Sequence, residues 1–439
     1  MQVKNDEKVI NAWAMFDWAN SAYNLVITTT IFPAYYVAIT TNDDNGNMVQ
    51  FLGHNFINTV LQDYALSFAY LIMVFLLPIL SSIADYRGNK KVFMQFFTVL
   101  GSLACCGLFF FDDQHIERGI ICFAVAAIGY SGGFVFYNSY LPEIASVNMQ
   151  DRVSAKGFTY GYIGSVLLQL ICFVFVLFPE TFHLDKGSAA RLSFLLTGLW
   201  WIGFAMIPFK VLPKGSPNAK SHQHDVIRLG FIELGKVWVK LKGMPMLRGF
   251  LPAFFFYSMG VQTIMLVATA FAAKELKMDT PELIIIILII QVVAILGATL
   301  MSRLSDKIGN LKVLILTVCI WIGVCMGAYF TTTKIEFYVI AVIVGLVMGG
   351  IQSMSRSTYS KYLPPNIADT ASFFSFYDVT EKLAIVAGLF SFGFIEEITG
   401  NMRNSTIALC GFFIVGLVFL LLLLATEKKL NKNSEFSAV

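Results

Sequence analysis

The sequence has little charge. Only 13% of its 439 residues are Asp, Glu, Lys or Arg, whereas 57% are hydrophobic, and soluble proteins carry about a quarter charged residues. A chain of this composition cannot cover a soluble fold with polar side chains, so we predict an integral membrane protein. The net charge of +3 is small, and it gives little support to nucleic-acid binding.

Side chains typical of metal sites and of catalysis are also scarce. The seven cysteines fall within apolar runs without metal-ligand spacing, so we interpret them as packing residues. The five histidines lie in loops without paired spacing. Residues 230–237 nearly match a phosphate-binding loop, but Val237 stands where a Ser or Thr is needed. We therefore predict no metal, no cofactor and no enzymatic activity.

Long apolar runs fill most of the chain. A bilayer core about 30 Å thick needs roughly 20 apolar helical residues per crossing. About twelve runs of that length are present. They lie near residues 11–39, 61–83, 91–111, 118–140, 156–178, 191–211, 248–273, 281–301, 313–332, 336–357, 373–395 and 405–425.

The distribution of Lys and Arg predicts the orientation, because short basic loops stay on the cytoplasmic side. With both termini in the cytoplasm, about 23 of the 31 basic residues fall inside. The first apolar run is too long for a cleavable signal peptide. We therefore expect a multi-pass protein of a bacterial inner membrane with cytoplasmic termini.

One turn occurs twice, in the pattern D-x-x-G-N-x-K. The first copy has Asp85, Gly88 and Lys91, with Lys90 just before the motif lysine, and the second, 221 positions later, has Asp306, Gly309 and Lys312. In such a turn Gly permits a tight loop, Asp can accept hydrogen bonds from a neighbouring helix N-terminus, and Lys can meet lipid head groups. We interpret both copies as gating loops that act as latches between helices, the alternative being simple basic loops.

The repeat predicts two similar halves, as in many transporters. We expect an all-α membrane protein with twelve transmembrane helices in two pseudo-symmetric six-helix bundles. The bundles are predicted at 1–211 and 248–439. Residues 212–247 form a cytoplasmic linker whose second part has apolar residues at helical spacing, either an amphipathic helix at the membrane surface or a solvated connector.

Polar side chains within apolar runs are costly in lipid, so they indicate the interior of the bundle. In the first run such residues share one helical face: Trp13, Asp17, Asn20, Ser21 and Asn24. Asp17 is our first candidate for proton coupling or for binding a substrate ammonium group, and the alternative is a structural pair with a neighbouring helix. Tyr137, Asn138 and Gln262 are further candidates for a binding wall, although aromatic residues are abundant and commonly serve packing.

Two other runs add candidates. Gln352 and Arg356 lie four residues apart and so share a face; Arg356 can hold a carboxylate, form a gate ion pair or reach lipid phosphate. The eleventh run begins with Tyr377, Asp378, Glu381 and Lys382. Asp378 and Lys382 form an i, i+4 pair that leaves Glu381 without a local partner, so Glu381 is a second coupling candidate. An inner gate is the alternative for this group.

The paired turns resemble the loop motif of the major facilitator superfamily, with Ser81, Tyr86 and Asn89 departing from it. Several longer segments resemble one subfamily, related to the vacuolar autophagy-associated effluxers: residues 17–23, 138–145, 161–165, 349–357 and 373–378. The resemblance implies two six-helix halves around a central cavity, alternating access, and export of amino acids or similar small amphiphilic molecules.

The sequence therefore predicts a secondary active transporter of small organic solutes, driven by protons and acting as a monomer in contact with membrane lipids. An alternative on the same fold is a lipid or lysolipid flippase. An alternative from another class is a membrane sensor, which would bind a partner without moving a solute.

Overall fold

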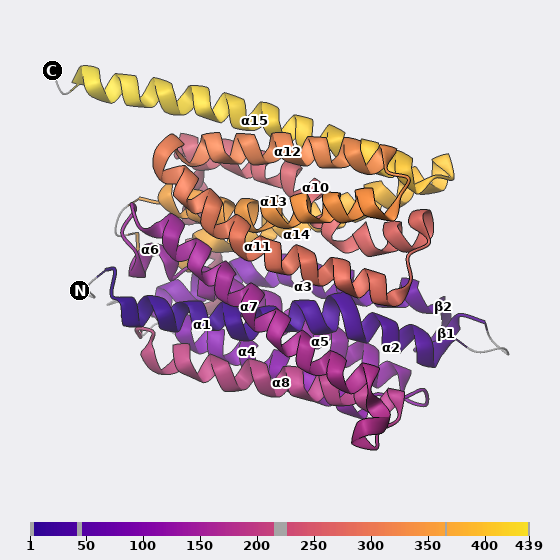
Figure 1. The fold of residues 1–439 in the computed structure, drawn as a ribbon. Coiled ribbons are helices and arrows are strands. Elements are labelled where there is room, and N and C mark those ends of the chain that lie inside the picture. The colour runs from indigo at the N-terminus through magenta and orange to yellow at the C-terminus, as the bar shows by residue number, and fades with distance from the viewer. Residues whose placement is uncertain (1–3, 42–45, 215–225, 365–366, 438–439) are drawn as a thin grey trace. The chain divides into compact units, whose positions relative to one another are not determined.

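The computed structural model describes residues 4–41, 46–214, 226–364 and 367–437 and is built mainly of long helices (Figure 1). Its internal contacts divide the chain into two units, which are described separately. Unit 2 comprises Asp6–Tyr140 and Tyr160–Gly230. Unit 1 comprises Met1–Asn5, Leu141–Thr159 and Phe231–Val439. The segment Leu141–Thr159 thus packs with the carboxyl-terminal helices, and the division into bundles at 211 and 248 stays a prediction.

Unit 2 holds the helices of the first half of the chain. They are α1 (Glu7–Tyr23), α2 (Ile31–Thr40), α3 (Asn58–Arg87), α4 (Lys90–Gly107), α5 (Ile116–Asn138) and α8 (Lys186–Val211), with short 3₁₀ helices at Leu108–Phe110 and Pro179–Phe182. Helix α7 (Gln150–Leu177) begins in unit 1 and continues in unit 2 from Tyr160. Asp185 caps α8, and hydrogen bonds from the hydroxyl and backbone N–H of Ser188 hold the pKa of its carboxyl below the ordinary value.

The first span is not a uniform α-helix. Between α1 and α2 the chain forms a π-helix, η1 (Asn24–Thr30). The hydroxyls of Thr29 and Thr30 donate to the carbonyls of Asn24 and Leu25, five residues earlier, at 2.8 and 2.7 Å. These bonds stabilise the wider turn, a feature frequent at functional sites.

A two-stranded hairpin follows the first span. Strands β1 (Met48–Phe51) and β2 (His54–Ile57) pair antiparallel, with Phe51 opposite His54. The two turn residues Leu52 and Gly53 both have positive φ, as a tight hairpin turn requires. The apolar pattern of the sequence did not predict this hairpin.

Unit 1 holds the helices of the second half. They are α10 (Pro245–Leu276), α11 (Thr280–Ile308), α12 (Asn310–Phe330), α13 (Lys334–Lys361), α14 (Thr370–Thr399) and α15 (Met402–Ser437). The short helix α6 (Leu141–Ile144) and the first ten residues of α7 also belong to it.

Small residues bring helices together within each unit. In unit 1 α11 and α13 approach so closely that a Cβ added at Gly349 would collide with the carbonyl of Ala294, and one at Gly345 would collide with the carbonyl of Ile290. In unit 2 Gly129 of α5 meets Gly101 of α4 in the same way. The glycine spacing in the sequence predicts such contacts, which are typical of membrane helices.

Eleven helices within the described ranges are long and apolar enough to cross a membrane. Helix α14 occupies the place of the expected span at 373–395 but is not among them, because Asp378, Glu381 and Lys382 interrupt its apolar sequence. At about 1.5 Å per residue its 30 residues extend about 45 Å, enough to cross a bilayer core. The charged side chains of α14 therefore make it a candidate for function.

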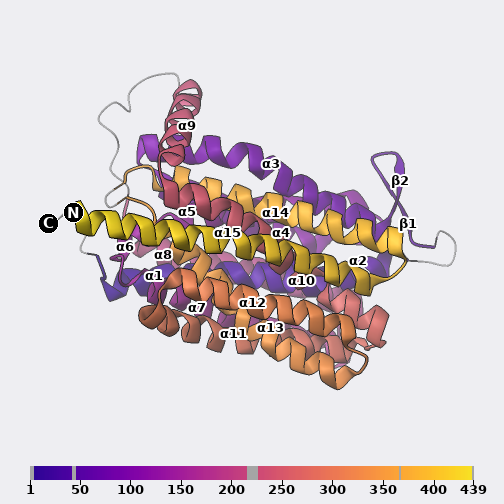
Figure 2. The same cartoon turned by 90° about the horizontal axis from the view of Figure 1, so that it is seen from above.

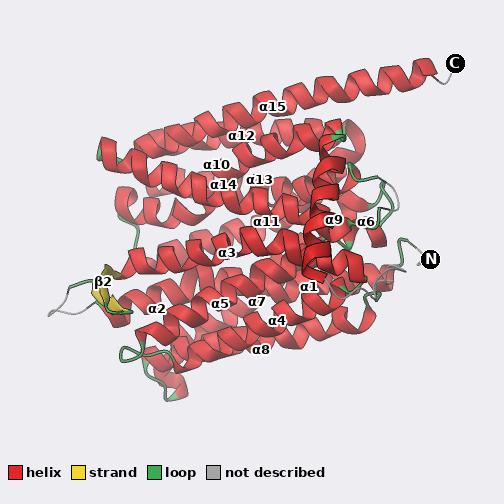
Figure 3. Ribbon diagram, turned by 180° about the vertical axis from the view of Figure 1, so that it is seen from behind, coloured by secondary structure: helices red, strands yellow, loops and turns green. Residues whose placement is uncertain are grey.

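A helix also lies in the linker. α9 (Val226–Lys242) runs across the direction of α14 rather than along it (Figures 2 and 3). In unit 1 Trp238 contacts Phe376 of α14, with ring centroids 5.6 Å apart, and Lys240 pairs with Asp369 at 2.5 Å. Phe231 and Val239 are 54% and 68% exposed. Residues 215–225 of the linker lie outside the described residues.

Candidate functional site

In unit 2 Asp17 lies inside the packed helices and is 1% exposed. Its Oδ2 accepts a hydrogen bond from the Tyr137 hydroxyl of α5 at 2.6 Å. The Trp13 indole N–H donates to the Tyr137 carbonyl at 3.0 Å, and the two rings stack with centroids 4.4 Å apart. The structure therefore brings three predicted residues together, and it gives Asp17 a partner on a neighbouring helix.

Other residues of the predicted stripe lie around this cluster. Ser21 and Asp17 face α7 at Gly161, where an added Cβ would lie 2.6 Å from the Ser21 hydroxyl. Asn20 is fully buried, and neither side-chain atom has a hydrogen-bond partner among the described residues. A buried amide in this state costs free energy unless a ligand or water satisfies it.

The remaining candidates of unit 2 mark helix ends. Asn24 begins the π-helix η1, and Asn138 ends α5 with 1% exposure. The polar stripe of the first span therefore stops where the regular α-helix stops.

In unit 1 a polar cluster joins α10 to α14. Gln262 donates to a carboxylate oxygen of Glu381 at 3.0 Å, and Lys382 Nζ lies 3.7 Å from Glu381 and 3.7 Å from Asp378. Asp378 and Lys382 are 1% and 5% exposed at their side chains, and Glu381 is 15% exposed. The expected pair of Asp378 with Lys382 is present.

The expectation that Glu381 lacks a local partner is wrong. Lys382 follows it directly, and Gln262 reaches it from α10. Sequence spacing along one helix could not show the second contact, because it joins residues 119 positions apart. The Lys382 ammonium group thus lies within ion-pair distance of two carboxylates, those of Asp378 and Glu381.

The surroundings of this cluster are aromatic and polar. Tyr377 stacks on Phe254 of α10, with ring centroids 4.2 Å apart. The Tyr257 and Ser355 hydroxyls are hydrogen-bonded at 2.7 Å, and Gln352 Nε2 lies 3.5 Å from the Met265 sulfur. These contacts join α10, α13 and α14 within unit 1.

Arg356 of α13 is 1% exposed. Its guanidinium donates to the hydroxyl of Ser154 at 2.9 Å and to the backbone carbonyl of Ser154 at 2.7 Å, and it lies 4.1 Å from the centre of the Phe158 ring. Burial excludes the reading in which this side chain reaches lipid phosphate. Its contacts hold α13 against the first turns of α7.

The second turn also contacts the start of α7. Asp306 pairs with Arg152 at 2.8 Å. Asp151, 2% exposed, accepts hydrogen bonds from Ser305 at 2.8 Å, from Asn310 at 2.7 Å and from Lys361 at 2.5 Å. The second turn and the end of α13 therefore bind the amino-terminal end of α7 by hydrogen bonds and ion pairs.

The first turn has different contacts. Gly88 ends α3 in the left-handed conformation, with φ 64° and ψ 30°. Lys90 lies 3.9 Å from the Tyr140 ring centre and Lys91 donates to the Leu212 carbonyl at 2.6 Å. Lys90 is only 5% exposed, so the expectation that it meets lipid head groups is wrong. Asp85, the other predicted residue here, lies in the last turn of α3.

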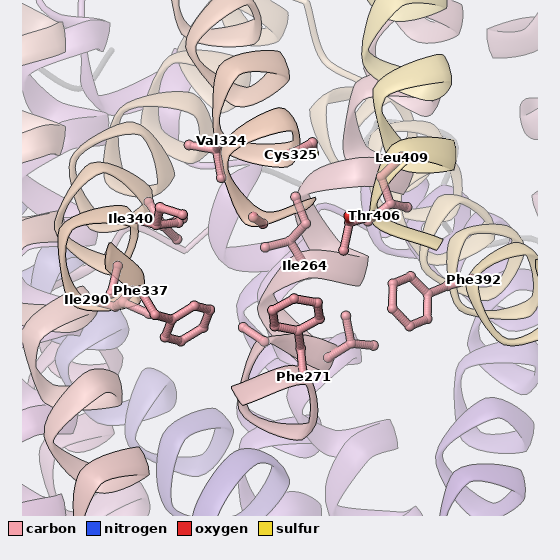
Figure 4. A pocket seen from close by; sticks show the side chains of 15 residues that line it. Ile264, Phe271, Ile290, Val324, Cys325, Phe337, Ile340, Phe392, Thr406 and Leu409 are labelled. Atoms are coloured by element: carbon pink, nitrogen blue, oxygen red, sulfur yellow. The ribbon is translucent and has the colours of Figure 1, made fainter. Parts of the chain in front are cut away.

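An apolar cavity of about 50 Å³ lies within unit 1 (Figure 4). Side chains of α10 to α15 converge on it, including Ile264, Phe271, Phe337, Phe392 and Leu409. A cavity lined in this way stays dry and accepts apolar groups only.

Comparisons with known proteins agree with this architecture. The family model described as vacuole effluxer Atg22-like matches residues 5–434. The chain belongs to this family. A Bacillus subtilis protein described as the uncharacterized MFS-type transporter YxiO is 32% identical over 422 residues, 95% of each chain. Autophagy-related protein 22 of Kluyveromyces lactis is 28% identical, covering 86% of this chain and 82% of that protein.

Solved structures show the same fold. The proton:xylose symporter XylE, a major facilitator superfamily protein, superposes with a TM-score of 0.70 at 13% identity, covering 94% of each chain. The Atg22-like chain is thus a multi-pass membrane transporter with the major facilitator fold, and its family membership indicates transport rather than enzymatic catalysis.

Sequence reasoning missed several residues of this Atg22-like chain. Asp151, Arg152 and Ser154 fall between the predicted spans at 118–140 and 156–178, yet they bind the second turn and Arg356. The only available signal was an adjacent acid and base at the start of an apolar run. Their partners lie more than 150 positions away.

Proposed function

We propose that this chain is a proton-coupled secondary transporter that exports small organic amphiphilic solutes, such as amino acids, by alternating access. Membership of a family described as effluxers supports export, and the fold shared with a symporter supports a secondary mechanism. We place it as a monomer in a bacterial inner membrane with both termini in the cytoplasm, on the distribution of basic residues.

The cluster on α14 carries the proposal of proton coupling. Asp378 and Glu381 each lie 3.7 Å from Lys382, so these three charged side chains form one group on a membrane helix. Glu381 is the more exposed carboxylate, and we assign it the exchangeable proton.

Asp17, the first coupling candidate from the sequence, is the other carboxylate that we propose for coupling. It accepts a 2.6 Å hydrogen bond from Tyr137 and is 1% exposed. Loss of this hydrogen bond during transport would change the surroundings of the carboxylate.

The residues that we assign to solute binding are polar and buried or half-buried. Asn20 is the strongest, because both of its side-chain atoms are unsatisfied within the described part of the chain. The others are Trp13, Ser21, Asn24, Tyr137, Asn138, Gln262, Gln352, Arg356 and Tyr377.

The two turns are assigned to gating, and a gate is also the alternative role of Arg356. Arg356 holds Ser154 of α7, and Asp306 and Asp151 hold the same end of that helix. Movement of α7 would have to break these bonds. Gly88, Lys90 and Lys312 complete the turns.

The test begins with identification of the solute. Thermal-shift screening of the purified protein against amino acids, peptides, nucleosides and lysolipids would find a ligand, since binding to the native state raises stability. Transport of that ligand is then measured in proteoliposomes with and without an imposed pH gradient. Transport that ignores the gradient would refute proton coupling.

Two variants locate the proton. Glu381→Gln should lose accumulation driven by the pH gradient and keep solute exchange, because Gln preserves the bond to Gln262 but cannot titrate. Glu396→Gln is the matched control on the same helix, where Glu396 pairs with the exposed Lys274. Asp17→Asn should behave like Glu381→Gln if Asp17 also couples. Normal gradient-driven transport by either site variant would remove that residue from the mechanism.

The apolar cavity favours one alternative, a lipid or lysolipid flippase, because its lining suits part of an acyl chain. Reconstituted protein that moves a fluorescent lysolipid across vesicles, with no transport of any soluble ligand, would support it. A membrane sensor would instead bind a partner stably without solute movement.

A further inference from the structure

Within unit 1 a hollow of about 500 Å³ lies between the first turns of α7 and the last turns of α11. Three basic side chains line it, Arg152 and Lys156 from α7 and Arg303 from α11. Its other polar lining residues are Thr159, Thr299 and Ser302. No acidic residue is among the described residues that line it, so the hollow is positively charged.

The charges are only partly balanced. Arg152 pairs with Asp306 at 2.8 Å. Lys156 and Arg303 form no ion pair with any residue that the structure describes. Two basic groups held near each other on a low-dielectric membrane protein attract an anion.

Hydrogen-bond donors point to the same ligand. Ser302 is 2% exposed, and its hydroxyl has no partner within the described ranges. The Thr159 hydroxyl oxygen is also buried and without a partner there. Buried hydroxyls are rarely left unsatisfied, and together with Lys and Arg they suit the oxygens of a phosphate.

The exposed apolar surface of α11 favours a lipid as the source of that phosphate. Val292, Leu296 and Leu300 follow one another at intervals of four along this helix and are 49%, 63% and 52% exposed. They form an apolar ridge that leads along α11 toward Ser302 and Arg303. The acyl chain of a lipid can lie on this ridge while the lipid head group occupies the hollow. A soluble anion has no apolar part that could contact the ridge.

We propose that this hollow binds the phosphate head group of an anionic phospholipid, from the leaflet at the α11–α12 turn. With the orientation proposed above, this is the inner leaflet. Basic pockets between helices on that side suit such head groups. The site is separate from the cluster on α14 and does not depend on the identity of the solute.

The experiment measures the melting temperature of the full-length protein in detergent during titration with phosphatidylglycerol. Phosphatidylcholine and inorganic phosphate are titrated separately. Phosphatidylglycerol should stabilise the native protein, and the double variant Lys156→Gln/Arg303→Gln should need about thirtyfold more lipid, since each basic residue near an anionic surface contributes about a factor of five. The control Lys428→Gln/Lys429→Gln removes the same charge from exposed positions of α15 and should titrate like the unmodified protein.

Three results would overturn the proposal. They are an unchanged titration in the double variant, an equal loss in the control variant, and full stabilisation by inorganic phosphate, which would show a site for soluble anions. If the double variant does not fold, Ser302→Ala keeps both charges and should still weaken phosphatidylglycerol binding severalfold. An unchanged titration of Ser302→Ala would then refute the site.

Discussion

The two copies of the D-x-x-G-N-x-K turn share a sequence and differ in their contacts. The first copy, in unit 2, uses its lysines: Lys90 lies on Tyr140 and Lys91 binds the Leu212 carbonyl. The second copy, in unit 1, uses its acid and its amide: Asp306 binds Arg152 and Asn310 binds Asp151. In unit 2 the motif therefore contacts Tyr140 and Leu212, which follow α5 and α8. In unit 1 it contacts the amino-terminal end of α7.

The glycines show the same divergence. Gly88 is left-handed and ends α3, whereas Gly309 has φ 88° and ψ 154°, an extended conformation open essentially to glycine only. A repeated sequence thus preserves the place of a turn without preserving its backbone. Whether each turn acts as a latch between helices depends on the residues around it. Substitutions can test how the contacts and backbone of the two turns differ.

The largest expected effect comes from Asp151, which the second turn surrounds. Asp151→Asn should lower the free energy of unfolding by about 3 kcal/mol, because it leaves Lys361 without its buried carboxylate. Denaturant unfolding in detergent measures this change. Glu143→Gln, at α6 in the same unit, is a control that removes a less buried carboxylate. An equal loss of unfolding free energy in both variants would show that burial of the Asp151–Lys361 pair does not add to stability.

The glycines should differ next. Gly309→Ala is expected to cost about 2 kcal/mol, because its conformation is closed to alanine. Gly88→Ala should cost about 1 kcal/mol, since the left-handed region is only strained for a side chain. Asn tolerates the left-handed region, so Gly88→Asn should unfold close to the unmodified protein and Gly309→Asn should not. A reversed order would mean that the two turns share one backbone.

The lysines should show the opposite asymmetry. Lys91→Met removes a charged hydrogen bond to a backbone carbonyl and should cost about 1.5 kcal/mol. Lys312→Met changes an exposed residue and should remain within about 0.5 kcal/mol. The melting temperatures of the two variants, compared under one condition, decide this point. Equal stability would mean that the buried lysine adds nothing.

The smallest effect is expected at the exposed ion pair. Asp306→Asn should cost about 0.5 kcal/mol, because Arg152 is 61% exposed at its side chain. The difference should shrink in about 1 M salt, because salt screens the attraction between exposed charges. A larger cost that persists in high salt would make this pair, rather than Asp151, the main fastening.

Much of the fold could be predicted from the sequence, because bilayer thickness sets the length of each apolar run. The expected run at 313–332 corresponds to α12, and the one at 336–357 lies within α13. The close contact at Gly349 also fits the four-residue spacing of Gly345 and Gly349 along one helix. These features depend on neighbours along one helix.

The candidate site was less predictable, since its contacts join distant positions. The bonds of Asp17 to Tyr137 and of Glu381 to Gln262 each depend on a second helix. Helix α14 differs: its charged residues stand out in the sequence as functional candidates, and the same residues keep it out of the set of helices apolar enough to count as membrane spans. Their roles in binding and coupling stay predictions.

The π-helix at Asn24–Thr30 has a consequence for reading the first span. Each of its turns accommodates more residues than an α-turn, so the residues after Thr30 are out of phase with those before Asn24. A helical wheel drawn through the whole segment would assign Phe32 and Tyr36 to the wrong side. Aligning relatives by a single period would carry that angular error through every residue of α2.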